Sequence, residues 1–217
     1  MTAEREQRLS QVYGARSNQE LQTLYDAWAD HYDQDLAAFG YTYPALMAGL
    51  VARHVRNLDS PILDAGAGTG ILGAILHALG YDRLVGIDLS DGMLSVARRK
   101  GVYGELKNRT LGQPLDFADD SFGAAISAGV LTVGHAPPDS LEELVRVTRP
   151  GGHVIFTLSA PVYEEGGFRQ KLDALAAAGR WRAVDVTRPW QALPNAPSEH
   201  AHASRAYAFR VLVGGSP

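Results

Sequence analysis

The stretch that decides the fold is Ile62-Leu63-Asp64-Ala65-Gly66-Ala67-Gly68-Thr69-Gly70. Its apolar start predicts a short buried strand, and its three glycines predict a tight turn that leads into a helix. Because these three positions lack a Cβ, a ligand can approach the main chain closely, as in a binding loop. The carboxylate of Asp64 would repel a phosphate and attract an ammonium or a hydroxyl, which argues against a pyrophosphate ligand.

Strand, turn and helix patterns alternate after this loop. Helices are expected at about 69–79 and 140–148, near Asp91 and past Gly166, and strands at about 84–88, 102–106, 122–128, 153–158, 181–186 and 207–213. The segment at 102–106 has the weakest strand pattern. Alternation of this kind predicts an α/β fold with a doubly wound, mostly parallel, seven-stranded, Rossmann-like sheet. The last two strands have no helix between them, so the final strand is expected to be antiparallel.

The residues before Pro61 have a helical character. The first dozen residues are polar and are expected to form a frayed or loosely docked lead-in. Apolar and aromatic residues then recur at three- and four-residue steps from Leu21 to Leu36, which predicts an amphipathic helix capped by Ser17 or Asn18. A second helix is expected from Pro44 to about Arg56. We therefore expect an N-terminal helical extension or lid at 1–57 and a core at 58–217, together forming one globular unit.

Composition excludes several classes of partner. A net charge of −4 and a pI near 6.0 give no general attraction to nucleic acid or to an anionic membrane, which favours a small-molecule partner. No apolar run is long enough to span a membrane, and the polar start lacks a signal-peptide pattern. The absence of cysteine excludes disulfides and fits a cytoplasmic location. Oligomeric state cannot be read from the sequence.

Asp88 ends the second expected strand, 18 residues after Gly70. This is close to the spacing at which an acidic residue accepts hydrogen bonds from a ribose diol, so an adenosine-like ligand is expected. The alternative is that Asp88 only caps the next helix, but Ser90 and Asp91 are better placed for that role. The run from Gly68 to Gly73 also matches G-x-G-x-x-G, so the loop by itself does not exclude a dinucleotide.

Four motifs together resemble the class I S-adenosylmethionine-dependent methyltransferases. They are D-A-G-A-G-T-G at 64–70, G-I-D-L-S at 86–90, D-D-S-F at 119–122 and R-V-T-R-P-G-G at 146–152. A narrower resemblance, to the methyltransferase-like proteins named after the Williams-Beuren region, rests on Y-D-A-W-A-D-H-Y-D-Q-D-L at 25–36, G-Y-T-Y-P at 40–44, G-V-L-T-V-G-H at 129–135 and G-R-W-R at 179–182. The resemblance covers about residues 20 to 190.

The resemblance implies S-adenosyl-L-methionine as cofactor and S-adenosyl-L-homocysteine as product. It implies that Asp64 and the loop backbone hold the methionine portion, that Asp88 holds the ribose, and that Tyr25 and Tyr32 bond the cofactor carboxylate. The complete set of expected cofactor residues is Tyr25, Tyr32, Asp64, Ala65, Gly66, Ala67, Gly68, Thr69, Gly70, Asp88, Leu89, Ser90, Met93, Leu111, Gly112, Ala128 and Gly129. Trp28 is as consistent with core packing as with ligand contact.

The sequence departs from the family pattern at two positions. Thr110 stands where an Asp often precedes the residue that contacts adenine, and Gly123 replaces the Asp that usually follows the phenylalanine of the third motif. His135 follows the fourth strand and could accept a proton from a nucleophile, although it could equally bond a loop carbonyl. His200 and His202 form an H-x-H pair without a further clear ligand, so no metal site is expected.

These observations favour an enzyme that transfers a methyl group from S-adenosylmethionine to a small-molecule acceptor. Two other hypotheses stay open. One is a non-catalytic module that binds the cofactor or its product, and the other is a cyclase or lyase that consumes the sulfonium on the same fold. The acceptor and its nucleophilic atom cannot be read from the sequence.

Overall fold

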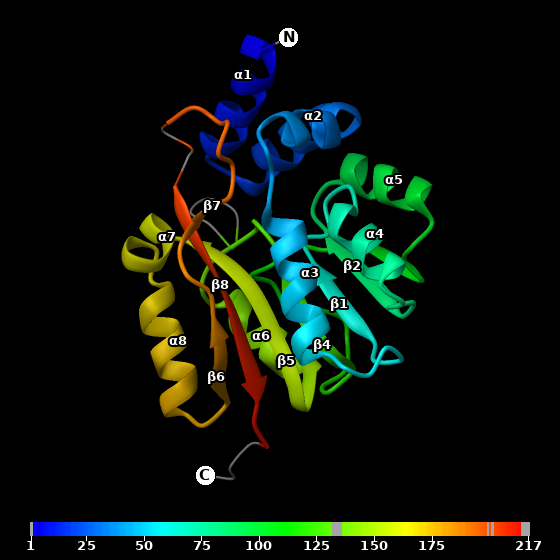
Figure 1. The fold of residues 1–217 in the computed structure, drawn as a ribbon, viewed down its shortest axis with the longest axis vertical. Coiled ribbons are helices and arrows are strands. Elements are labelled where there is room, and N and C mark those ends of the chain that lie inside the picture. The colour runs from blue at the N-terminus through cyan, green and yellow to red at the C-terminus, as the bar shows by residue number, and fades with distance from the viewer. Residues whose placement is uncertain (1, 132–135, 199, 201, 214–217) are drawn as a thin grey trace.

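The computed structural model describes residues 2–131, 136–198, 200 and 202–213. Helices and strands alternate from β1 to β5, as the sequence pattern predicts, except that β4 follows β3 without a helix between them (Figure 1). The elements are α1 (Thr2–Tyr13), α2 (Asn18–Ala38), α3 (Tyr43–His54), β1 (Ile62–Ala65), α4 (Ile71–Ala78), β2 (Leu84–Asp88), α5 (Asp91–Lys100), β3 (Glu105–Asn108), β4 (Phe122–Ser127), α6 (Ser140–Val147), β5 (Thr148–Ser159), α7 (Ala160–Glu165), α8 (Phe168–Ala177), β6 (Trp181–Val186), β7 (Trp190–Gln191) and β8 (Ala203–Val211).

All strands belong to one sheet, in the order β3-β2-β1-β4-β5-β8-β6, with β7 paired to β8 outside this path. The strands from β3 to β5 pair in parallel, whereas β8 runs antiparallel to both β5 and β6. This confirms the predicted fold class. The two-residue β7 is an addition to the seven predicted strands. The strand order reverses between β1 and β4, which in sheets of this type marks the ligand crevice at the carboxyl ends of the strands.

Helices cover both faces of the sheet. Ile62 and Leu63 are adjacent in β1 and both fully buried, yet they belong to opposite hydrophobic clusters because successive strand residues point to opposite faces. One cluster is completed by apolar residues of α3 and α4, and the other by residues of α6, α7 and α8. Burial on both sides explains why these short strands read as nearly continuous apolar runs.

The N-terminal dozen residues form α1, so the prediction of a frayed lead-in was wrong. Leu9 and Val12 are each 3% exposed and pack in a cluster with Trp28 of α2. The Arg8 guanidinium adds an ion pair of 2.7 Å with Asp35. Only two apolar residues anchor the helix, which is too weak a pattern to identify in the sequence. Figure 1 shows α1 and α2 above the carboxyl ends of the parallel strands.

Several element boundaries differ from the prediction. β3 begins at Glu105 rather than near 102, and it is an edge strand made largely of polar residues. The last strand ends at Val211, which leaves Val213 79% exposed. The short helix α7 was not predicted. Within the described part of the chain, no helix combines the length and apolar character needed to cross a membrane.

Candidate functional site

The glycine loop after β1 adopts the conformation that its sequence predicts. Gly66, Gly68 and Gly70 all have positive φ, at 90°, 54° and 83°. The amides of Gly66 and Ala67 both donate to the Ile87 carbonyl, at 2.8 and 2.9 Å, which fastens the loop to the end of β2. A Cβ on Gly68 would meet no atom within 4 Å, so the loop faces open space at this point.

That space is a cavity of about 620 Å³, partly open to solvent, between α2 and the carboxyl ends of β1, β2 and β4. The predicted cofactor residues among its lining are Tyr25, Tyr32, Gly66, Gly68, Asp88, Leu89, Met93, Leu111, Ala128 and Gly129. The structure therefore brings together residues from five separate segments of the chain.

The remaining predicted residues lie beside this cavity. Asp64, Ala67 and Thr69 line an adjoining space, which shares Tyr32, Gly66, Gly68 and Ala128 with the first. Four others line neither space and have structural contacts instead: the Ala65 carbonyl accepts from Ser127, Gly70 abuts Tyr103, Ser90 caps α5, and Gly112 turns against Pro137.

Asp88 lines the main cavity and is 8% exposed. Its Oδ2 accepts from the Gly68 amide at 2.8 Å and its Oδ1 from the Ser90 amide at 2.9 Å. Burial raises its pKa to about 6, although these backbone amides oppose the rise. Each carboxylate oxygen keeps a lone pair for a further donor, so a diol could bind both oxygens. Asp88 thus orders the loop, while Ser90 accepts from the Met93 amide and caps the helix.

Asp64 is 2% exposed, and its Oδ2 accepts a hydrogen bond of 2.6 Å from the Tyr103 hydroxyl. Burial raises its pKa to about 7, and the Tyr103 hydrogen bond only partly offsets this rise. Near neutral pH the group therefore exists in both forms. A cationic ligand beside it would favour the ionised form, because an opposite charge lowers the pKa of a carboxyl group.

Tyr25 and Tyr32 project from α2 into the main cavity, with ring centroids 6.2 Å apart. Burial raises the pKa of both hydroxyls well above the ordinary value, so both stay protonated and can donate. Trp28, between them in sequence, is 2% exposed and donates to Asp35 Oδ2 at 2.8 Å. Trp28 is therefore a core residue and does not line the cavity.

Helix α2 is fastened over the cavity by contacts with α5. Asp26 Oδ1 accepts from the Ser90 hydroxyl at 2.6 Å and from the Gly92 amide at 2.8 Å. A Cβ on Gly92 would lie 2.8 Å from the Asp26 Cα, so only glycine permits this approach. One turn on, Asp30 pairs with Arg99 at 2.7 Å. The position of α2 over the cavity therefore depends on tertiary contacts between α2 and α5.

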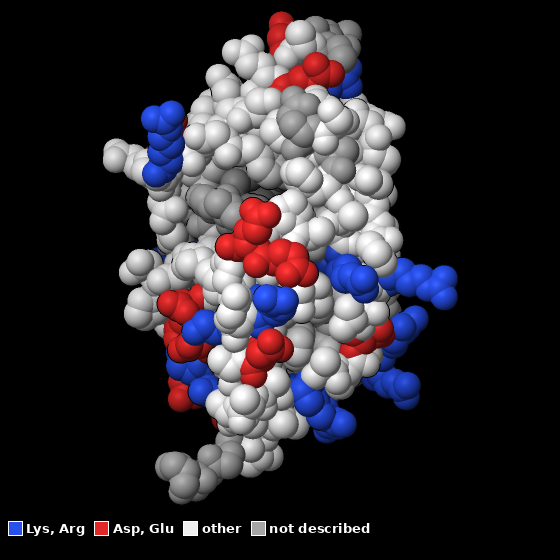
Figure 2. All heavy atoms as spheres, turned by 90° about the vertical axis from the view of Figure 1, so that its left-hand side faces the viewer, with Lys and Arg blue, Asp and Glu red and all other residues white. Residues whose placement is uncertain are grey.

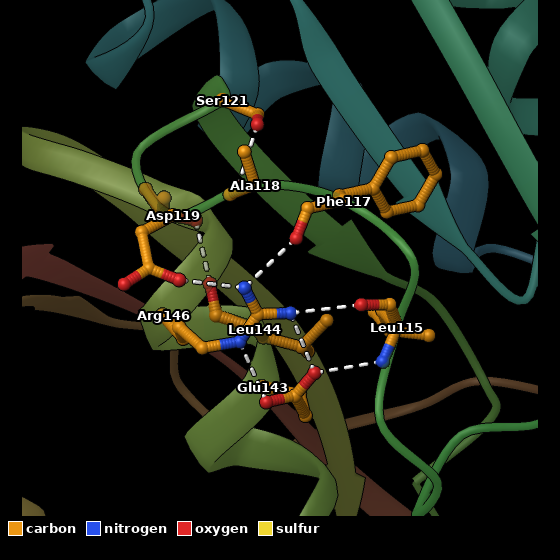
Figure 3. Close-up of polar contacts among 9 residues, drawn as sticks. Leu115, Phe117, Ala118, Asp119, Ser121, Glu143, Leu144 and Arg146 are labelled. Carbon is orange, nitrogen blue, oxygen red and sulfur yellow. Dashed lines mark hydrogen bonds and ion pairs between the residues drawn. The ribbon is translucent and has the colours of Figure 1, made fainter.

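The loop segment from Leu115 to Asp119, which follows Leu111 in the chain, is anchored by Arg146 (Figure 3). This guanidinium donates to the carbonyls of Leu115 and Phe117 at 3.0 and 2.8 Å and to Asp119 at 2.7 Å. It also forms a paired contact with Glu143, both bonds at 2.8 Å. The motifs at 119–122 and 146–152 are therefore linked physically, since Arg146 of the second motif binds Asp119 of the first.

Sequence reasoning missed several residues of the site. Arg109 and Val130 line the main cavity, Tyr103 bonds Asp64, and Asp26 anchors α2. None of them stands in a motif whose spacing indicates its role. His135, the predicted catalytic residue, lies outside the described residues. Across the residues that are described, no group of three His, Asp or Glu side chains is arranged to hold a metal.

Comparisons with known proteins agree with this geometry. Residues 63–156 match the family model described as a methyltransferase domain. Human methyltransferase-like protein 27 is 36% identical over 178 residues, which cover 78% of this chain and 72% of that protein. A demethylmenaquinone methyltransferase of Paenarthrobacter aurescens is 36% identical over 66% of this chain, but the match spans only 56% of that relative's length.

A solved structure with the same fold is that of the [4+2]-cyclase SpnF. It superposes with a TM-score of 0.72 at 18% identity, over 92% of this chain and 98% of that one. At this identity the likeness concerns the fold alone. The match to methyltransferase-like protein 27, in contrast, covers most of both chains. The chain therefore belongs to the class I S-adenosylmethionine-dependent methyltransferases, the family whose cofactor is S-adenosylmethionine, as a relative of methyltransferase-like protein 27.

Proposed function

We propose that this protein binds S-adenosylmethionine in the cavity beneath α2 and transfers its methyl group to a small-molecule acceptor, with release of S-adenosylhomocysteine. The observation that carries the proposal is the convergence of the glycine loop, Asp88 and the α2 tyrosines on one cavity. Relatives named demethylmenaquinone methyltransferases support a small-molecule acceptor.

The lining of the cavity fits the parts of this cofactor. Asp88 offers two partly satisfied carboxylate oxygens for the ribose hydroxyls, and Leu89, Met93 and Leu111 offer an apolar surface for adenine. Asp64 is suited to an ammonium group because its ionised form gains from a nearby cation. The hydroxyls of Tyr25 and Tyr32 are protonated donors suited to a carboxylate. The full predicted set of cofactor residues remains part of this proposal.

The bound cofactor would supply a methyl group on a sulfonium, which needs an incoming nucleophile held in line with the breaking bond. The protein contributes mainly by positioning and by excluding water. The partly buried Tyr25 and Tyr32 of α2 cover one side of the cavity, and Ala128 and Gly129 form another wall at the end of β4. We propose in addition that residues 1–57 act as a lid, since Tyr25 and Tyr32 of α2 cover one side of the cavity.

The departures from the family pattern do not argue against this function. Thr110 lines the cavity, so a backbone or hydroxyl group is available near the place of the missing Asp. Gly123 lies at the start of β4, away from the cavity at the carboxyl end. A Cβ there would come 2.8 Å from the Ser60 Cβ and 3.1 Å from an Arg149 nitrogen, so glycine is required for local packing.

The test has two stages. Calorimetric titration with S-adenosylmethionine, S-adenosylhomocysteine and nicotinamide dinucleotides measures binding, with Asp88→Asn as the matched control. The protein is then incubated with S-adenosylmethionine and a metabolite extract, and mass spectrometry follows the sulfur products. We expect both sulfur compounds to bind, the dinucleotides not to bind, and S-adenosylhomocysteine to accumulate only with the wild-type protein.

Other outcomes separate the alternatives. Binding without any turnover would favour a non-catalytic module. Formation of methylthioadenosine would favour a reaction that consumes the sulfonium in another way, and the cyclase found among proteins of the same fold makes this readout worthwhile. Tight dinucleotide binding with no response to either sulfur compound would overturn the proposal.

A further inference from the structure

A second cavity, of about 860 Å³ and also partly open to solvent, adjoins the first. Gly129 lines both, so the two spaces meet at the end of β4. The walls of the second cavity come from α1, α3, the ends of β5 and β8, α7 and the segment before β8. The described residues that line it are Tyr13, Tyr43, Gly129, Leu131, Thr157, Ser159, Pro161, Val162, Ala192, Leu193, His200, His202 and Ser204.

The described lining of this cavity combines apolar side chains with a few polar groups. Among the described lining residues there is no Asp, Glu, Lys or Arg, and the polar groups are hydroxyls and imidazoles. The rest are apolar side chains such as Leu131, Val162 and Leu193. Figure 2 looks at the side of the molecule that carries α7 and α8, and it shows a hollow bordered mainly by uncharged surface, with acidic side chains gathered below it.

Three hydroxyls in this cavity are held in place. The Thr157 hydroxyl accepts from the Gly129 amide at 2.8 Å, at the boundary of the two cavities. The Tyr43 hydroxyl forms a hydrogen bond of 2.7 Å with Ser204 Oγ, and Ser204 is 2% exposed. The Tyr43 ring is fixed between Tyr41 and Trp190, with edge-to-face centroid distances of 5.5 and 5.7 Å. The polar groups are thus preorganised and do not need a ligand to order them.

We propose that the second cavity binds the methyl acceptor, and that the acceptor is an uncharged, partly apolar molecule with a hydroxyl or carbonyl oxygen that Tyr43 and Ser204 recognise. This inference rests on the proposed methyl transfer. It goes further by naming the chemical class of the acceptor and the pair of residues that selects it.

Two physical arguments support this choice. A charged ligand would lose its hydration without an ionic partner in the described lining, and that loss opposes binding strongly. Burial raises the pKa of Tyr43 to about 12, so at neutral pH its hydroxyl is a neutral donor rather than a base. Because one hydroxyl of the pair donates to the other at 2.7 Å, the pair keeps one O–H donor to offer to a ligand oxygen, and this favours ligands that carry the matching oxygen over analogues that lack it.

The experiment uses one ring system in three charge states. The probes are para-phenylphenol and two analogues that carry a carboxylate or an aminomethyl group on the second ring. Each is titrated calorimetrically at pH 8 into the full-length protein saturated with S-adenosylhomocysteine. We expect the neutral phenol to bind at least about tenfold more tightly than either charged analogue.

Variants then test the recognition pair. Tyr43→Phe and Ser204→Ala should each weaken binding of the neutral phenol about fivefold or more, while binding of S-adenosylhomocysteine stays unchanged. The matched control is Tyr81→Phe, which removes the hydrogen bond of another tyrosine hydroxyl, to the Val55 carbonyl, and lines neither cavity. Melting temperatures confirm that each variant is folded.

The experiment distinguishes a failure of the proposed function from a failure of this inference. Loss of S-adenosylhomocysteine binding by the folded wild-type protein would overturn the proposed function. Normal binding of S-adenosylhomocysteine would instead overturn this inference alone in any of three cases: a charged analogue binds as well as the neutral phenol, no probe binds, or Tyr43→Phe and Ser204→Ala bind the phenol as the wild type does.

Discussion

The Tyr103 hydroxyl donates a hydrogen bond of 2.6 Å to a carboxylate oxygen of Asp64, which links the loop before β3 to the carboxyl-terminal part of β1. Position 73 must be glycine to leave room for Tyr103, because a Cβ on Gly73 would lie 2.2 Å from the Tyr103 hydroxyl. The contact supplies the buried Asp64 with a donor. It therefore opposes the rise in the pKa of Asp64 that burial causes, and the net value is about 7.

Cofactor affinity should depend on pH around neutrality. Ionisation of Asp64 is favoured by a nearby ammonium, so binding below a pKa of about 7 requires release of a proton, and affinity should fall as pH falls. We expect about a tenfold loss of S-adenosylhomocysteine affinity from pH 8 to pH 6. Calorimetry in two buffers of different ionisation enthalpy counts the protons released.

Two variants identify the group responsible. Asp64→Asn should bind about a hundredfold more weakly at pH 8 and lose most of the pH dependence. Tyr103→Phe should move the transition to higher pH, because the lost hydrogen bond favours the ionised form. A flat profile in the wild-type protein would show that Asp64 does not face the ammonium.

Asp88 should be required in its ionised form for cofactor binding. Asp88→Asn preserves size and one acceptor oxygen, but its NH₂ group would face the amide of Gly68 or Ser90. We expect S-adenosylhomocysteine affinity to fall about tenfold or more. Titration with adenosine provides the specific readout. If Asp88 holds the ribose, Asp88→Asn should lose as much affinity for adenosine as for S-adenosylhomocysteine, relative to the wild type. An unchanged adenosine affinity would contradict that role.

Much of the fold and part of the site could be predicted from the sequence. The glycine loop and Asp88 were identifiable because their chemistry depends on residue type at short spacing. Tyr103 and Arg109 were not, because their positions near Asp64 and in the cavity arise only from tertiary folding. The same reasoning explains α1, whose two buried residues gain their partners from α2.

Some motif residues make structural contacts, and the sequence alone cannot distinguish such residues from those that bind a ligand. Ser90 was expected among the cofactor residues, yet its hydroxyl donates to Asp26 and accepts from the Met93 amide. Gly112 was also expected among the cofactor residues, but a Cβ there would lie 2.7 Å from Pro137, so close packing alone requires glycine. Short motifs thus identify the neighbourhood of a site more reliably than the role of each member.

Helix α2 should loosen when its contact with α5 is removed. Asp26→Ala deletes two hydrogen bonds at the start of α5, to the Ser90 hydroxyl and the Gly92 amide. We expect faster amide exchange in residues 18–38 and about tenfold weaker binding of S-adenosylhomocysteine. The control is Asp30→Ala, because its ion pair with Arg99 is highly exposed and should contribute little. Equal effects of the two variants on amide exchange and on binding would contradict the proposal that Asp26 holds α2 in place over the cavity.

Arg146 should be a major determinant of stability. Arg146→Ala leaves the carbonyls of Leu115 and Phe117 without their donor and Glu143 without its cation. We expect the free energy of unfolding in urea to fall by about 2–3 kcal/mol. The control, Arg53→Ala, breaks an ion pair with Asp185 at a mostly exposed arginine and should cost less than about 1 kcal/mol. Arg146→Lys should lie between them, since an ammonium cannot reproduce the paired contact with Glu143. If Arg146→Ala were no more destabilising than Arg53→Ala, the loop from 115 to 119 would have to be held by its backbone turns and the Phe117–Phe122 ring contact instead.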